Sequence, residues 1–268
     1  MMNLTTCKPG GDSSVPEIPA IASFLSEYAA WLLGCGATCI RIEKNSRRIA
    51  TAFGVGLDIS VMPSHVIVAV WRGSESETYV TMRKTVNCGI SFDLNAKLSR
   101  LSWKISDSNL DLQSAKRIFT SIKDTGPTGK WTILLLTSVA NASFCRLFGG
   151  DLIAMMTVFI STIIGYRVKQ IMLEGKKDTR LTFLCASFFS ASISASGHIF
   201  EIGSTPEIAL GTSVLYLIPG VPYINAVNDL IDRHYLCAFS RFTEAVTLTA
   251  CLSAGLCIGI LLLGLELI

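Results

Sequence analysis

The chain has 268 residues and a net charge of +3; 50% of its residues are hydrophobic and only 16% are charged. A soluble globular domain carries roughly 25% charged residues, so this composition excludes an ordinary soluble protein over the whole length. The shortage of charge is local. Fifteen of the 23 Lys and Arg residues lie at or before Lys130, and the later charges form clumps between apolar runs. A chain of this length forms one or two domains, and the change near Lys130 favours two.

The predicted division places a disordered N-terminal segment at residues 1–19, a small soluble domain at 20–128 and a membrane domain at 129–268. The N-terminal segment is rich in Gly, Ser and Pro and lacks the apolar core of a signal peptide. We therefore expect the soluble domain to stay on the side of the membrane where the chain is synthesised, which is the cytoplasm.

The soluble half shows both helical and strand patterns. Apolar residues recur at helical spacing from Pro16 to Gly34, and Gly34 and Gly36 end that helix. Further helices are predicted at Thr38–Phe53, Phe92–Ile105 and Leu110–Ile122, and strands at Asp58–Met62, His65–Trp71 and Glu77–Arg83. The breaker Asp124–Pro127 serves as the linker. This order predicts a small α+β domain with an antiparallel meander of three strands.

The second half contains four long apolar runs: Trp131–Phe148, Gly149–Tyr166, Leu181–Phe200 and Ala245–Leu265. The last run would extend about 32 Å as a helix, enough to cross a hydrocarbon core of about 30 Å. The run Leu181–Phe200 is crowded with Ala, Ser and Gly, which let helix backbones approach closely, so we expect it inside the bundle. These runs predict an α-helical integral membrane protein with about five transmembrane helices.

One predicted span is broken. The apolar stretch Ile208–Ile218 precedes Pro219-Gly220-Val221-Pro222, and a helical segment Tyr223–Ile231 follows. Proline lacks an N–H and hinders the preceding turn, so we expect the break at Pro219–Pro222. One face of the next segment carries Asn225, Asn228, Asp229 and Asp232. Such a face at membrane depth must line protein or water, and broken helices often form substrate sites in transporters.

Two interpretations of this face stay open. If it lines a transport path, Asn225→Ala and Asp229→Ala should abolish transport and leave the membrane abundance near that of the wild type. The alternative is a helix that ends at Pro219, followed by a polar loop at the membrane interface.

Basic residues predict the orientation, because cytoplasmic loops carry an excess of Lys and Arg. Between the second and third runs lie Arg167, Lys169, Lys176, Lys177 and Arg180, and before the last run lie Arg233 and Arg241. The opposite loops hold only Arg146. With five crossings, the N-terminus is inside the cell and the C-terminus is outside.

The sequence contains no P-loop, dinucleotide-binding glycine pattern or GxSxG motif, and its nine Cys and three His residues show no paired metal-ligand spacing. We therefore expect no catalytic residue, metal or cofactor, and no nucleic-acid partner. Besides a transporter, two alternatives stay open: an enzyme anchored by its helices, and a scaffold or sensor whose soluble domain carries the function.

The stretch from Leu217 to Ile231, LIPGVPYINAVNDLI, resembles the signature of the threonine/serine exporter family. Other pieces agree in order: LGCGA at Leu33–Ala37 with Arg41, RIATAFG at Arg48–Gly54, Thr81 and Arg83 with Gly89, and FGGD at Phe148–Asp151. The resemblance implies an exporter of small carboxylate metabolites, either succinate-like dicarboxylates or threonine and serine, in the inner membrane of a bacterial cell. With one membrane half, the chain is more similar to the first subunit of the split form, which implies a second small membrane subunit.

These patterns together give candidate site residues. The substrate path would be formed by Pro219, Gly220, Pro222, Asn225, Asn228 and Asp229, and Gly36, Gly149 and Gly150 would serve helix packing or hinges. Arg146 would pair with a substrate carboxylate on this interpretation. On the alternative, Arg146 is a snorkelling residue that extends its charge to the membrane interface.

Overall fold

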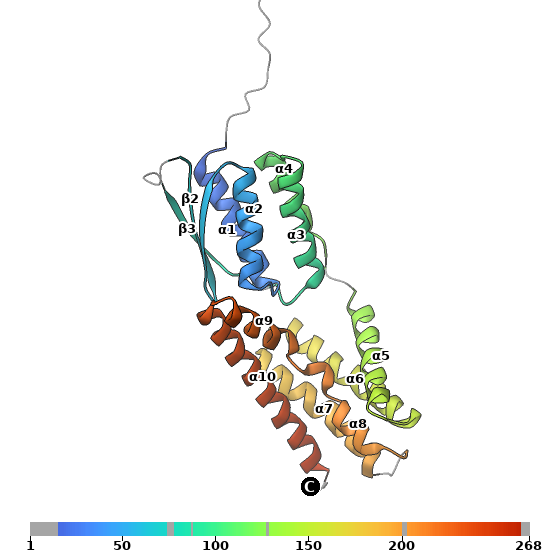
Figure 1. The fold of residues 1–268 in the computed structure, drawn as a ribbon. Helices are drawn as coiled ribbons and strands as arrows, with labels where there is room; N and C mark the ends of the chain where they lie inside the picture. The colour runs from blue at the N-terminus through green and yellow to red at the C-terminus, as the bar shows by residue number, and fades with distance from the viewer. Residues whose placement is uncertain (1–15, 74–77, 87, 127–128, 200–202, 264–268) are drawn as a thin grey trace, which may run out of the picture. The chain divides into compact units, whose positions relative to one another are not determined.

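Figure 1 shows the computed structural model of the chain, which describes residues 16–73, 78–86, 88–126, 129–199 and 203–263. The chain divides into two compact units, Met1–Asp124 and Thr125–Ile268. Some predictions lie outside the described residues: the disorder expected for residues 1–15, the strand start at Glu77, Pro127 in the linker, the helix ends at Phe200 and Leu265, and the chain end at Ile268.

Among its described residues, the first unit contains α1 Ile18–Gly34, α2 Cys39–Ala52, β1 Gly56–Val61, β2 His65–Trp71, β3 Tyr79–Lys84, α3 Phe92–Asp107 and α4 Leu112–Lys123. Strand β2 lies in the middle of the sheet and pairs antiparallel with both neighbours. In the register, Val68 lies opposite Ile59 on one side and opposite Thr81 on the other. The predicted small three-stranded sheet among helices is confirmed, with small shifts at the ends of the elements.

The core of the first unit lies between the sheet and α1. Along β2 the buried residues are Val66, Val68 and Val70, and they alternate with half-exposed ones, as a strand with one buried face requires. Phe24 and Tyr28 of α1 also meet Phe119 of α4, with ring centroids 5.7 and 6.2 Å apart. Apolar burial therefore joins the helices to the sheet.

Polar side chains join α2 to α3 at three successive turns. Arg41 donates to Asn95 Oδ1 at 3.2 Å, Asn45 donates to Ser99 Oγ at 2.9 Å, and Arg48 donates to Ser102 Oγ at 2.7 Å. The guanidinium of Arg48 also lies 3.6 Å from the ring centroid of Trp103. These contacts fix how α2 lies along α3.

Gly36, one of the predicted packing glycines, lies in the turn between α1 and α2. Its φ of 85° is in the left-handed region, which glycine adopts without a steric penalty. A Cβ added there would lie 3.2 Å from Cγ1 of Ile90. The turn between the two helices therefore requires a glycine for both its backbone conformation and its close neighbour.

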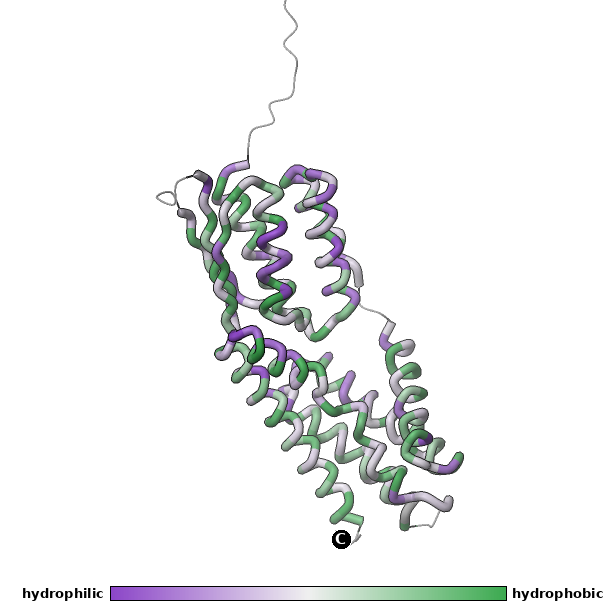
Figure 2. The backbone as a smooth tube through the Cα atoms, in the orientation of Figure 1, coloured by the Kyte–Doolittle hydropathy of each residue, from purple (hydrophilic) through white to green (hydrophobic). Residues whose placement is uncertain are grey.

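The second unit is a bundle of helices: α5 Lys130–Leu147, α6 Leu152–Glu174, α7 Thr179–Ile199, α8 Pro206–Thr212, the 3-10 turn η2 Leu215–Leu217, α9 Gly220–Ile231 and α10 Tyr235–Leu262. Helix α7 packs against α6 and α10, and α9 packs against α10. Figure 2 shows that apolar residues predominate along these helices.

Two of the described helices, α6 and α10, are long and apolar enough to cross a membrane, and the bent pair formed by α8 with η2 and α9 is a third candidate. Helices α5 and α7 are less apolar. Helix α5 contains Lys130, Asn141 and Arg146, and five serines lie along α7. The chain is thus mostly helical with two or three membrane-capable helices, a smaller number than the five that we expect from the sequence.

Helix α7 lies inside the bundle, as its small residues predict. Gly165 of α6 and Gly255 of α10 approach it from two sides, and a Cβ on either glycine would overlap a serine hydroxyl of α7, that of Ser190 or Ser187 respectively. The buried residues on α7 include Ala186, Ser187, Ser190, Ala191, Ser194 and Ala195. Small residues on both sides therefore allow the helix backbones to pack closely.

Helices α6 and α10 are longer than the apolar runs that predict them, since α6 continues past Tyr166 and α10 starts well before Ala245. As a result, Arg167, Lys169 and Arg241 lie within helices, and their expected position in loops is wrong. A basic residue can extend such a helix because its aliphatic stem covers apolar surface. The ammonium of Lys169, for example, lies 4.9 Å from the ring centroid of Phe183.

Candidate functional site

The bent helix formed by α8, η2 and α9 is the centre of the candidate site. Helix α8 ends at Thr212, one turn of 3-10 helix follows, and Pro219 precedes α9 at a bend of 57°. Pro222 lies in the first turn of α9, where the missing N–H removes no helical hydrogen bond. The predicted break at Pro219–Pro222 is therefore wrong in its extent, because Pro222 fits inside the helix. Gly220 begins α9, and a Cβ there would meet open space.

Buried polar groups gather where α8 ends. The amide nitrogen of Asn141 on α5 donates to Thr162 Oγ1 at 2.8 Å and to the Thr212 carbonyl at 3.2 Å. The last carbonyls of a helix have no amide partner four residues further on, and a buried carbonyl needs a hydrogen bond. Asn141 therefore supplies a donor to a carbonyl at the break, and both Asn141 and Thr162 are buried.

Tyr216 in η2 extends this group to a third helix. Its hydroxyl lies 2.9 Å from Oγ of Ser190 on α7, and Ser190 also donates to the Ser161 carbonyl at 3.2 Å. The ring of Tyr216 lies 5.9 Å from that of Tyr166. Asn141, Thr162, Ser190 and Tyr216 are called the break cluster below. Tyr216 belongs to the interrupted helix, Asn141 and Ser190 hydrogen-bond to that helix, and Thr162 accepts from Asn141.

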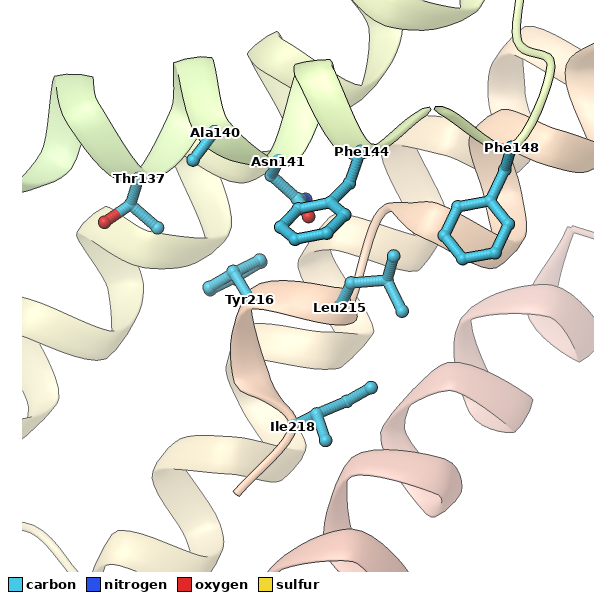
Figure 3. A pocket seen from close by; sticks show the side chains of 8 residues that line it. All are labelled: Thr137, Ala140, Asn141, Phe144, Phe148, Leu215, Tyr216 and Ile218. Atoms are coloured by element: carbon cyan, nitrogen blue, oxygen red, sulfur yellow. The ribbon is translucent and has the colours of Figure 1, made fainter. Parts of the chain in front are cut away.

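A cavity of about 420 Å³ opens beside the break cluster. It is lined by Thr137, Ala140, Asn141, Phe144, Phe148, Leu215, Tyr216 and Ile218. Figure 3 shows the side chains of α5 on one side and those of Leu215, Tyr216 and Ile218 on the other. Ligand pockets of this kind have mostly apolar walls and a few placed polar groups, which are Thr137, Asn141 and Tyr216 here.

A buried ion pair joins α9 to α10. Nη1 of Arg241 lies 2.7 Å from Oδ2 of Asp229, whose side chain is fully buried, while that of Arg241 is 15% exposed. The backbone amide of His234 also donates to the Asp229 carbonyl at 2.7 Å, at the end of α9. Ionisable residues inside membrane helices are rare, are usually paired and mark functional sites.

The polar face predicted on α9 divides in the structure. Asp229 is buried against α10, Asn225 is half-buried, and Asn228 and Asp232 are exposed within the chain. On the same helix, the hydroxyl of Tyr223 lies 3.0 Å from Thr249 Oγ1 of α10. The structure thus places part of the face against α10 and leaves the other part on the surface of the bundle.

Arg146 lies in the last turn of α5, and Gly149 and Gly150 lie in the turn that connects α5 to α6. Nη1 of Arg146 donates to the Gly150 carbonyl at 3.1 Å, and Gly149 has a φ of 91°, which favours glycine. A Cβ on Gly150 would collide with Cys145, so this turn needs both glycines. Figure 1 shows that α5 ends at one end of the bundle and that α9 ends and α10 begins at the other. The structure therefore does not bring Arg146 together with Asp229.

Asp151 closes the same turn. Its carboxylate accepts hydrogen bonds from the Ser204 amide at 2.7 Å, the Ala154 amide at 2.6 Å and the Ser204 hydroxyl at 2.8 Å. These hydrogen bonds stabilise the ionised form and lower the pKa of Asp151 to about 2. Asp151 thereby caps α6 and ties the turn to the segment before α8.

Sequence reasoning missed most of these contacts as site features. It did not single out Asn141, Thr162 or Tyr216, and it assigned Arg241 to a loop. One signal was present, because Asn141 is the one side-chain amide in the run Trp131–Phe148. The contact between Tyr216 and Ser190 depends on how η2 packs on α7, and no local sequence pattern predicts it.

A bundle of apolar helices with a bent span, a buried ion pair and polar groups at the break is typical of membrane transport proteins. The family model for threonine/serine exporters, ThrE, matches residues 23–263. The chain is 25% identical over 253 residues to the "Probable succinate transporter subunit YjjP" of Klebsiella aerogenes, covering 93% of this chain and 96% of that protein. It is 26% identical over 251 residues to the protein of the same name from Escherichia coli K12, covering 92% and 96%. No solved structure matches the chain.

The chain belongs to the threonine/serine exporter family, whose model matches nearly its whole length. This confirms the resemblance carried by the stretch from Leu217 to Ile231. The chain is therefore a membrane transport protein of an exporter family, and the alternative of a membrane-anchored enzyme is set aside.

Proposed function

We propose that the chain is one subunit of a secondary exporter that moves small carboxylate metabolites out of the cytoplasm. The names of the two relatives favour succinate, and the family's description favours threonine and serine. All of these molecules carry a carboxylate. The observation that carries the proposal is the bent helix α8–α9, whose break contacts the buried polar side chains of Asn141 on α5 and Ser190 on α7.

The proposed substrate path follows this bent helix. Pro219, Gly220 and Pro222 shape the start of α9, and Asn225 and Asp229 follow along it. Asn228 lies on the exposed side of α9, where a second subunit would complete the path. Arg146 belongs to the opposite end of the bundle, so we assign it to the exit of the path, where the metabolite leaves.

We further propose five crossings, formed by α5, α6, α7, the bent pair α8–α9 and α10, in the inner membrane of a bacterial cell. The turns that follow α6 and α9 carry Lys176, Lys177 and Arg233, Arg180 lies in the first turn of α7, and the turn after α5 lies beside Arg146 alone. Basic residues concentrate on the cytoplasmic side, which favours a cytoplasmic first unit and an external C-terminus.

Reporter fusions test this topology. A reporter that is active only outside the cytoplasm should be active when it is fused after Ile268 and inactive when it is fused after Lys177. The same two fusions with a reporter that is active only in the cytoplasm should give the opposite pattern. A cytoplasmic signal after Ile268 would contradict the model of five crossings.

A second small membrane protein is the proposed partner. The two relatives are named subunits, and the chain covers 96% of the length of each. Exposed polar residues on α9, at its C-terminal end and on α10 also favour a partner, because lipid is a poor neighbour for them: Asn228, Asp232, Thr243 and Glu244. Between two halves of a transporter, substrate sites lie at the interface.

An efflux assay tests the function and the partner together. We expect cells that produce this chain and its second subunit to export labelled succinate, threonine or serine faster than cells that lack both. Cells that produce this chain alone should export at the background rate. Export by the purified chain alone would overturn the requirement for a partner, and equal export of all three metabolites with and without both proteins would overturn the proposed function.

A further inference from the structure

Arg241 provides a cation that the proposed path has not yet used. It lies in the second turn of α10 and forms an ion pair with Asp229 on α9, the second half of the bent helix. Other basic groups in this unit have different surroundings, and the half-buried Lys169, for example, lies against the ring of Phe183. Arg146 is exposed and donates to the Gly150 carbonyl, and Lys130 is 60% exposed and pairs with Glu174.

A contribution to the stability of the fold is a weak explanation for the ion pair between Asp229 and Arg241. Both charges lose most of their hydration, and well-packed apolar residues in place of a buried ion pair are often as stable or more stable. Helices α9 and α10 also have other contacts that hold them together. The hydroxyl of Tyr223 lies 3.0 Å from Thr249 Oγ1, and the ring of Tyr223 lies 6.0 Å from that of Phe242.

The two members of the pair differ in exposure. The Asp229 side chain is 0% exposed, whereas the Arg241 side chain is 15% exposed, so Arg241 is the member of the pair that is partly accessible from the surface of the bundle. A guanidinium is planar and always charged, and its N–H groups match the two oxygens of a carboxylate. Asp229 itself is a carboxylate, so the structure already shows the ligand chemistry that Arg241 accepts.

We propose that Arg241 binds the carboxylate of the exported metabolite, and that Asp229 occupies the place of that carboxylate while the site is empty. The inference rests on the proposed function, but it does not depend on which metabolite is exported, because each candidate carries a carboxylate. The exchange replaces one carboxylate by another, so the buried guanidinium keeps an anionic partner in both states. The guanidinium is thereby never left without an anion, and the displaced Asp229 carboxylate must move to water or take up a proton, because an unpaired buried charge is costly.

A pair of variants tests this binding role. The double variant Asp229→Asn with Arg241→Gln removes both charges and keeps two side chains of similar size that can hydrogen-bond. We expect its membrane abundance to stay within about twofold of the wild type and its counterflow uptake of labelled succinate and threonine, in membrane vesicles that also contain the second subunit, to fall at least tenfold. Arg241→Lys keeps the positive charge opposite Asp229 but loses the planar guanidinium, which can donate to both oxygens of a carboxylate. It should raise the half-saturating metabolite concentration severalfold at similar abundance.

The outcomes separate this inference from the proposed function. If the wild type takes up neither metabolite, the proposed function fails first. If the wild type is active and the neutral double variant matches its rate, the role of Arg241 is wrong and the exporter assignment stands. Should the double variant fail to accumulate, Arg241→Lys decides, because an unchanged half-saturating concentration would refute the inference. Lys177→Gln, a basic-to-neutral change at an exposed position, is the control and should leave both values unchanged.

Discussion

Gly255→Leu should remove most of the folded protein from the membrane. A Cβ at Gly255 would overlap both Ser187 Oγ and the backbone carbonyl of Leu184 on α7. Because the carbonyl belongs to a helix backbone, it cannot turn away as a side chain does, and α10 would have to move off α7. Overpacking usually costs about 1–3 kcal/mol, and a displaced helix pair lies at or above the top of that range. Membrane abundance and the monodisperse peak in detergent are the measurements.

Gly211→Leu is the matched control. It makes the same substitution in the same unit, but a Cβ at Gly211 meets nothing within 4 Å. We expect the abundance of Gly211→Leu to stay close to that of the wild type. If both variants accumulate equally, the close packing of α10 on α7 is not what holds this bundle together.

Asp229→Ala should also lower abundance strongly, contrary to the expectation from the sequence. The substitution leaves the buried guanidinium of Arg241 without its ion-pair partner in α9. Removing one member of a buried pair typically destabilises a protein by about 3–5 kcal/mol, because the other charge stays buried. Quantitative immunoblots of membranes, with thermal stability measured in detergent, would give the size of the loss.

Asn228→Ala, at the adjacent residue, is the control for this effect. Asn228 is exposed within the chain, so its truncation should leave abundance unchanged. A wild-type level of Asp229→Ala would show that the pair contributes little to folding. It would also return Asp229 to the simple lining role that the sequence suggests.

The fold of the first unit could be predicted because its signals are local. Alternation along β2 follows from the single buried face of the sheet, and the residues before α3 and α4 carry side-chain caps. Ser91 Oγ accepts from the Leu94 amide, and the Asp111 carboxylate accepts from the amides of Gln113 and Ser114. In the second unit, the many small residues of α7 likewise predict from the sequence that this helix is buried in the bundle.

The candidate site could be predicted only in part. The two prolines of the PGVP stretch indicated the interruption, but the position of Pro222 inside α9 depends on where the helix starts. Hydropathy ended α6 too early and started α10 too late, because it penalises charges that a helix can carry. For this reason Arg241 was assigned to a loop, and its pairing with Asp229, which requires the packing of α9 on α10, could not be foreseen.

If Arg241 binds the exported metabolite, the length of α10 determines how deep in the bilayer that site lies. Its 28 residues extend about 42 Å, whereas the hydrocarbon core of a bilayer is about 30 Å thick. Such hydrophobic mismatch is relieved by tilting or by letting one end of the helix project among the lipid headgroups. The first turns, Tyr235–Phe242, precede the predicted apolar run and contain Arg241, so they are the end that projects. The guanidinium would then lie at headgroup level on one face of the bilayer, where a dissolved carboxylate reaches it before crossing any hydrocarbon.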